Sequence, residues 1–189
     1  LMVYFEDSRY SPSEAMVNAV RYCPLVWTMQ AKETYGDHFL GVYYRDELGG
    51  KKLDSIQPIA IGSTPVKPST CLSTANSFVE GLSSGMKDFS YVCKQAGASL
   101  FTSDYALYWF DYKGGYDVVL GQVGWNHSTS LNVALCRGAS NVQNKDWGAM
   151  VTWTYYNSPY LESGPQIYDE MVFAYDSGAK YVVIYDASD

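Results

Sequence analysis

The sequence predicts an α/β protein with a parallel sheet of the (β/α)8 barrel type, and this chain supplies about six βα units of it. Six apolar, β-favouring runs alternate with helical patterns, which is typical of right-handed βαβ units. Polar or aromatic residues follow nearly every strand, as they do at the carboxyl ends of barrel strands. No strand is followed by the Gly-x-Gly-x-x-Gly turn of dinucleotide-binding folds, which disfavours an open doubly wound sheet as the alternative.

The stretch from Phe39 to Gly50 carries most of this interpretation. Its apolar, β-branched and aromatic run indicates a strand buried on both faces, and the acidic pair Asp46 and Glu47 follows that strand. In α/β folds, ligands bind at the carboxyl ends of parallel strands. We therefore expect the acidic pair to lie at a functional site.

The other elements follow from local patterns. Further strands are expected at residues 1–5, 99–103, 116–124, 147–154 and 180–185. Helices are expected from Ser11, with an interruption at Pro24 and an end at Gly36; from a cap at Thr74 to Gly97; within residues 106–115; from Ser128 or Ser130; and before Gly178. Residues 51–75 hold three prolines among Ser and Thr and are expected to form a long loop excursion. Residues 1–189 are expected to form one domain.

The composition is globular and rich in tyrosine. Apolar residues make up 47% and charged residues 17% of the chain, which suits a single buried core. The 18 Tyr and 5 Trp favour a surface that binds sugars, because such rings combine an apolar face with a polar group. The net charge of −7 and the lack of a basic stripe argue against a nucleic-acid partner.

The cysteines Cys23, Cys71, Cys93 and Cys136 are spaced too widely for a zinc knuckle or a Cys-x-x-Cys redox site. We expect buried thiols, or one or two disulfides in an oxidising compartment. No signal peptide and no apolar run of about 18 residues occurs. Because the chain opens inside an expected strand and ends just after another, we expect it to be a piece of a longer protein.

Two segments resemble the barrel domains of glycoside-hydrolase-like proteins, including poorly characterised ones. The first is Phe39–Asp54. The second, Trp147–Asp186, contains Trp-Gly-Ala-Met-Val-Thr-Trp-Thr-Tyr, Tyr-Leu-Glu-Ser-Gly and Gly-Ala-Lys-Tyr-Val-Val-Ile-Tyr, and is similar to the last part of such a barrel. The resemblance covers about a third of the chain directly and implies a TIM barrel that acts on a carbohydrate. Many retaining barrel glycosidases have an Asn-Glu pair after the fourth strand, whereas no Asn precedes Glu47 or Glu162 here.

Glycoside hydrolysis needs two carboxyl groups, one that protonates the leaving oxygen and one that acts as nucleophile or base. The catalytic candidates at strand ends are Glu47, Asp104 and Glu162. Glu47 is the first choice for the proton donor, because the carboxylate of Asp46 would favour its protonated form if both shared one pocket. Asp104 or Glu162 would then supply the second carboxylate.

Substrate-binding residues are expected among the polar and aromatic side chains at the same strand ends. Rings can stack on sugar faces, while amide, imidazole and carboxylate groups can bind hydroxyls. This set comprises Asp7, Asp46, Tyr105, Gln122, Trp125, Asn126, His127, Trp153 and Tyr155.

Neither a metal ion nor a cofactor is expected. The two histidines lack the spacing of metal ligands, and the absence of a Gly-x-Ser-x-Gly elbow argues against a Ser-His-Asp triad.

The leading hypothesis is therefore a glycosidase that uses two carboxylates. A second hypothesis is a carbohydrate-binding or surface protein on the same barrel that lacks catalysis. A third, a barrel isomerase or lyase for a phosphorylated substrate, is disfavoured by the acidic charge and the missing phosphate-binding glycines.

Overall fold

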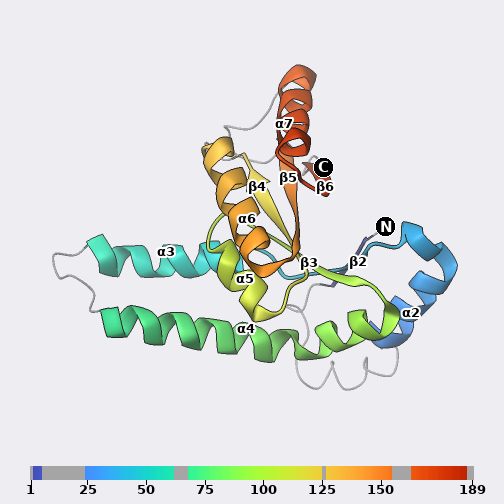
Figure 1. Ribbon diagram of the computed structural model, residues 1–189, viewed down its shortest axis with the longest axis horizontal. Coiled ribbons are helices and arrows are strands. Elements are labelled where there is room, and N and C mark those ends of the chain that lie inside the picture. The colour runs from blue at the N-terminus through green and yellow to red at the C-terminus, as the bar shows by residue number, and fades with distance from the viewer. Residues whose placement is uncertain (1, 6–23, 62–67, 125–126, 155–162, 187–189) are drawn as a thin grey trace.

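The computed structural model describes residues 2–5, 24–61, 68–124, 127–154 and 163–186 and shows an α/β fold in which strands and helices alternate (Figure 1). The strands are β1 (Met2–Phe5), β2 (Gly41–Tyr44), β3 (Ser99–Asp104), β4 (Val118–Val123), β5 (Asp146–Thr154) and β6 (Tyr181–Asp186). The helices are α2 (Pro24–Tyr35), α3 (Leu48–Ile61), α4 (Pro68–Ala96), α5 (Tyr108–Gly114), α6 (Thr129–Gln143) and α7 (Gly164–Asp176), with a short 3-10 helix η1 (Gly36–His38).

The six strands pair in parallel and in chain order, from β1 to β6. A doubly wound sheet reverses its strand order at a switch point, so this order excludes that alternative. Five strands curl through 218°, which makes the sheet a half-barrel. The predicted α/β class, with parallel strands that alternate with helices, is therefore confirmed. Of the predicted barrel, the structure shows a half-barrel.

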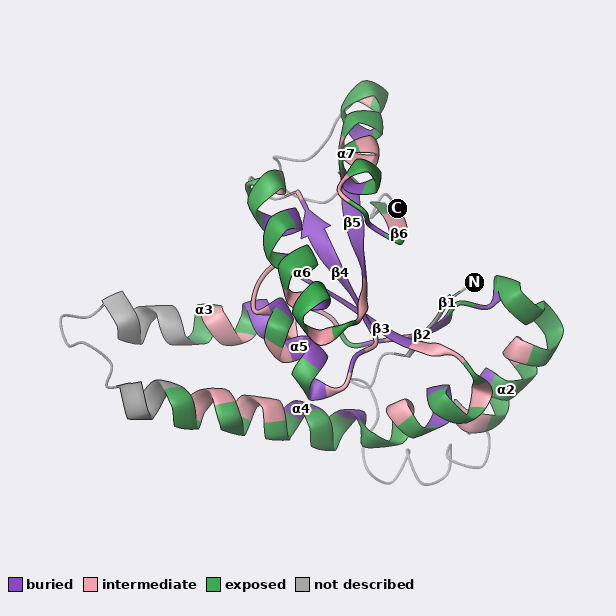
Figure 2. Cartoon of the chain, viewed as in Figure 1, coloured by how far each residue is buried: buried purple, intermediate pink, exposed green. Residues whose placement is uncertain are grey.

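The two faces of the sheet carry different packing. Alternate strand residues such as Val42, Leu100 and Val119 point outward and pack beneath the helices, where they join Met86 of α4 and Cys136 of α6 in the main core. Figure 2 shows that the central strands are buried, whereas the helices are exposed on their outer sides.

The residues between them in sequence face the inside of the curl. They form a second, smaller cluster there, composed of Phe101, Val118, Leu120 and Met150 with partly buried Tyr43, Tyr181 and Val183. This division into an outer and an inner row decides which strand-end side chains can reach a common site.

The loop expected over residues 51–75 was a wrong prediction. Helix α3 occupies Leu48–Ile61, and α4 begins at Pro68 rather than after a cap at Thr74. Pro68 occupies the first helical position, where the missing N–H costs nothing. The start of α3 is capped by a carboxylate from β3, which a local reading of the sequence cannot detect.

Most of the other boundaries agree with the predictions. Helix α2 begins at Pro24, and Gly36, Gly97 and Gly178, which were expected to end helices, all have positive φ. The helix expected from Ser11 to Pro24 lies outside the described residues. Cys93 and Cys136 are buried free thiols, which agrees with the first of the two alternatives predicted for the cysteines.

Candidate functional site

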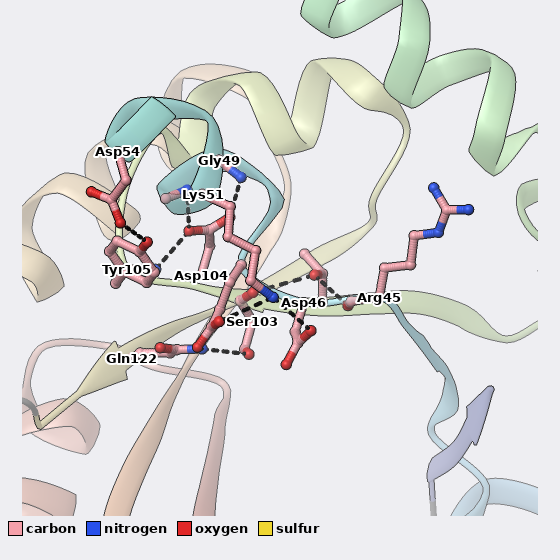
Figure 3. Close-up of polar contacts among 12 residues, drawn as sticks. Arg45, Asp46, Gly49, Lys51, Asp54, Ser103, Asp104, Tyr105 and Gln122 are labelled. Atoms are coloured by element: carbon pink, nitrogen blue, oxygen red, sulfur yellow. Dashed lines mark hydrogen bonds and ion pairs between the residues drawn. The ribbon is translucent and has the colours of Figure 1, made fainter. Parts of the chain in front are cut away.

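A short loop after β2 places the acidic pair at the carboxyl end of the sheet (Figure 3). Arg45 and Glu47 have φ values of 56° and 55°, a left-handed conformation that is uncommon for residues other than glycine. The backbone N–H of Glu47 donates to the carbonyl of Ser103 at 2.8 Å, and Thr102 Oγ1 donates to the carbonyl of Arg45 at 2.9 Å. The end of β3 thus fixes the loop.

The carboxylate of Glu47 is partly buried, with 27% of the side chain exposed, and two neighbours hold it. Gln122 Nε2 donates to Glu47 Oε1 at 3.2 Å, and Lys51 Nζ lies 3.2 Å from Glu47 Oε2. The same Nζ lies 3.7 Å from Asp46 Oδ1. Burial lowers the pKa of Lys51, but the carboxylates of Asp46 and Glu47 outweigh this and raise it overall. One ammonium therefore bridges the acidic pair.

Three strands contribute to a row of polar groups beside Glu47. Gln122 Nε2 also donates to Ser103 Oγ at 3.0 Å, and the hydroxyls of Ser103 and Tyr43 share a hydrogen bond of 2.6 Å. These residues belong to the inner row, because their positions alternate with the outward-facing core residues. We call Tyr43, Ser103, Gln122 and Glu47 the polar row.

The carboxylate of Asp104 points away from the polar row, toward the helix layer, and is fully buried. It accepts the backbone N–H groups of Gly49 at 2.6 Å, Gly50 at 2.8 Å, Tyr105 at 2.7 Å and Ala106 at 3.1 Å. Burial raises the pKa of Asp104 to about 6, against the lowering effect of these four donors.

Two glycines allow this approach between α3 and β3. A Cβ atom on Gly50 would overlap the ring of Tyr105, and one on Gly49 would lie 2.6 Å from the carbonyl oxygen of Ala106. Neither position can hold a larger residue without displacing its neighbours.

The ring of Tyr105 lies over the first turn of α3, next to His127. Its hydroxyl donates to Asp54 Oδ2 at 2.6 Å, and the ring centroids of Tyr105 and His127 are 5.7 Å apart. Burial, and then the hydrogen bond to Asp54, raise the pKa of Tyr105. The two rings form a small aromatic surface beside the acidic loop.

A second buried acid, Asp111 on α5, lies next to Asp104. It is fully buried, and neither oxygen of its carboxyl group has a hydrogen-bond partner within the described part of the chain. Burial, followed by the charge of Asp104, raises its pKa well above the ordinary value. Asp111 was not among the predicted site residues. Its position between Phe110 and Tyr112 in the sequence gave no signal for such a role.

The structure brings together part of the predicted set. Asp46, Glu47 and Gln122 share one contact network, and Tyr105 and His127 lie beside it. Of the other two described candidates, Asp104 faces the helix layer, and Trp153 is 44% exposed at the end of β5. Asp7, Trp125, Asn126, Tyr155 and Glu162 lie outside the described residues.

Sequence reasoning missed Tyr43, Lys51 and Ser103. The alternation of inward and outward residues along β2, β3 and β4 would have placed Tyr43 and Ser103 on the same face as Gln122. Lys51 stands four residues after Glu47, and this spacing on a helix would have predicted their ion pair.

The described residues contain no group of three or more His, Cys, Asp or Glu side chains arranged to hold a metal ion. None of the described helices combines the length and hydropathy needed to span a bilayer. Comparison of the chain with protein-family models and with curated proteins found no match.

Proposed function

We propose that this protein is a carbohydrate-active enzyme of the glycoside hydrolase type, with Glu47 as a reacting carboxylate. The observation that carries the proposal is the polar row, in which a partly buried carboxylate lies beside an amide and two hydroxyls at the carboxyl end of parallel strands. Such groups can hold a sugar by its hydroxyls while the carboxylate faces the anomeric carbon.

The contacts of Glu47 favour a role as nucleophile or base over the role of proton donor. Lys51 Nζ at 3.2 Å and the amide of Gln122 both stabilise a negative charge on this carboxylate. The proton donor would then be a second carboxyl group. Lys51 also lies 3.7 Å from Asp46 and favours its charged form, so the remaining candidate is Glu162, which the sequence places after an expected strand.

A second candidate function is carbohydrate binding without hydrolysis. It is favoured by Asp104, one of the three carboxylates expected to be catalytic. This carboxylate is fully buried and already accepts four N–H groups, so it cannot reach a sugar from its present position. Under this alternative, Glu47 and the ring of Tyr105 bind a saccharide that stays intact.

The test is hydrolysis of a panel of 4-nitrophenyl glycosides and soluble polysaccharides by the purified protein and its variants. Glu47→Gln keeps the shape of the side chain and removes its charge, and we expect kcat/KM to fall by about 10²–10⁴-fold. Glu80→Gln, on the exposed side of α4, is the matched control and should retain full turnover. Equal turnover by Glu47→Gln and the wild type would remove Glu47 from the mechanism.

Calorimetric titration with the same saccharides separates the two functions. Binding without turnover, weakened in Glu47→Gln and unchanged in Glu80→Gln, would establish the binding protein and exclude the enzyme. If no saccharide were bound or cleaved, both proposals would fail.

A further inference from the structure

The start of α3 is capped in an unusual way. A helix is commonly capped by the side chain of the residue just before it, which takes an extended backbone conformation and accepts the N–H groups of the first turn. Here Glu47 occupies that position. Its carbonyl accepts the first intrahelical bond, from the N–H of Lys51 at 2.9 Å, but its φ of 55° is left-handed. Its side chain points to Gln122 instead of to its own helix.

Asp104 supplies the missing cap from a different strand. Its two oxygens accept the N–H groups of Gly49 and Gly50, which are the second and third residues of α3 (Figure 3). The same carboxylate accepts the N–H groups of Tyr105 and Ala106 in the next loop. We call this set of four hydrogen bonds the Asp104 clamp, and it joins the first turn of α3 to the loop after β3.

We propose that Asp104 is a positioning residue, which caps α3 in place of Glu47 and thereby leaves the carboxylate of Glu47 to bind Gln122 within the polar row. The clamp is strongest when Asp104 is ionised, because only the carboxylate can accept all four N–H groups with both oxygens. A protonated oxygen becomes a donor, so the clamp loses an acceptor and Glu47 loses part of its support.

Asp111 lies beside the clamp and stays neutral. Two carboxyl groups buried this deeply and this close together repel each other when both are ionised, so ionising both costs free energy. Of the two, only Asp104 accepts N–H groups that stabilise its negative charge. Asp111 therefore keeps its proton. The titratable groups around the pair are Lys51 on α3, Tyr105, Tyr108 and Tyr112 on α5, Tyr116, and Cys136 on α6, and of these only Lys51 is cationic at neutral pH.

The clamp should therefore respond to pH. The pKa of Asp104 is raised to about 6 by burial, so Asp104 takes up a proton as the pH falls through that value. Asp111 stays protonated through this transition, so Asp111→Asn replaces one neutral group with another and the Asp104 midpoint should stay at about 6.

The experiment follows the backbone amides of Gly49 and Gly50 by two-dimensional NMR across a pH titration. In the wild type both amide proton signals should lie downfield at neutral pH, as strong hydrogen bonds to a carboxylate require, and move upfield together with a midpoint of about 6. Asp104→Asn should abolish the titration, whereas Asp111→Asn, which exchanges one neutral group for another, should leave the midpoint at about 6. Asp88→Asn, at an exposed position on α4, should leave the wild-type behaviour unchanged.

Glycine signals that do not titrate in the wild type, or that still titrate in Asp104→Asn, would overturn the clamp. A midpoint that Asp111→Asn shifts would overturn the assignment of Asp111 as a neutral neighbour. The wild-type titration decides the matter even where Asp104→Asn fails to fold. The link to Glu47 rests on the proposed function: turnover should fall on the acid side with the same midpoint as the glycine signals, with little change in KM. The NMR result stands independently of turnover, so the two proposals can fail separately.

Discussion

At the scale of single residues, neighbouring positions on one strand have opposite roles. Ser103 points into the curl and joins the polar row, whereas Asp104 points outward and caps a helix. The sequence located this strand end correctly. Taking Asp104 as a site residue because it ends a strand overlooked the alternation, which sends adjacent side chains to different faces of the sheet.

The close approach at Gly50 leads to a prediction on stability. Gly50→Ala would force a methyl group into the ring of Tyr105, so we expect the free energy of unfolding to fall by about 1–3 kcal/mol in urea titrations. Gly81→Ala, where a Cβ meets no atom within 4 Å, is the control and should stabilise α4 by about 0.5–1 kcal/mol. A change in the free energy of unfolding that has the same sign for Gly50→Ala and Gly81→Ala would refute the packing argument.

The proton on Asp111 affects stability with a defined sign. Because burial raises the folded-state pKa of Asp111, its stabilising contribution is fully present below the ordinary carboxyl range. That contribution is lost as the pH rises toward the folded-state pKa. Asp111→Asn should therefore raise the thermal midpoint at neutral pH more than at acidic pH. Thermal melts over a pH series measure this, and an equal shift at every pH would contradict it.

At the scale of elements, α6 supports the end of β4. The side-chain amide of Asn132 on α6 is buried and donates to the carbonyl of Gln122 at 3.0 Å. This bond fixes the strand residue whose own amide holds Glu47. A helix on the outer face therefore stabilises a contact on the inner face.

Asn132→Ala tests this support. It would leave the buried carbonyl of Gln122 without that donor, and we expect a loss of about 1–3 kcal/mol of stability by chemical denaturation. Asn141→Ala, at an exposed position on the same helix, should cost nothing. Similar stability of the two variants would show that the bond contributes little.

The elements also show how far local patterns can be used for prediction. The strands and the glycine-ended helices were predictable, because periodicity and backbone preference are properties of adjacent residues. Helix α3 was not, since its capping oxygens come from Asp104, more than fifty positions away. Within the site, Glu47 and Gln122 were found from their places at strand ends, whereas Lys51 required knowing that α3 is a helix.

At the scale of the whole molecule, the main core shields the thiols of Cys93 and Cys136 from solvent. Cys93 and Cys136 are fully buried, and burial raises the pKa of both, that of Cys93 to about 12. N-ethylmaleimide should therefore leave both unmodified in the native protein and label both in denaturant, as peptide mass spectrometry would show. Rapid labelling of either one under native conditions would mean that the core opens locally.

The uninterrupted strand order has a further result for how the molecule is made. Among the described strands, each of β2 to β6 hydrogen-bonds to the strand that comes just before it in the chain, so none of these five has to wait for a strand synthesised later. A polypeptide leaving the ribosome can therefore add one strand at a time to its sheet through a parallel crossover connection. Each new strand pairs with the edge strand that is already in place.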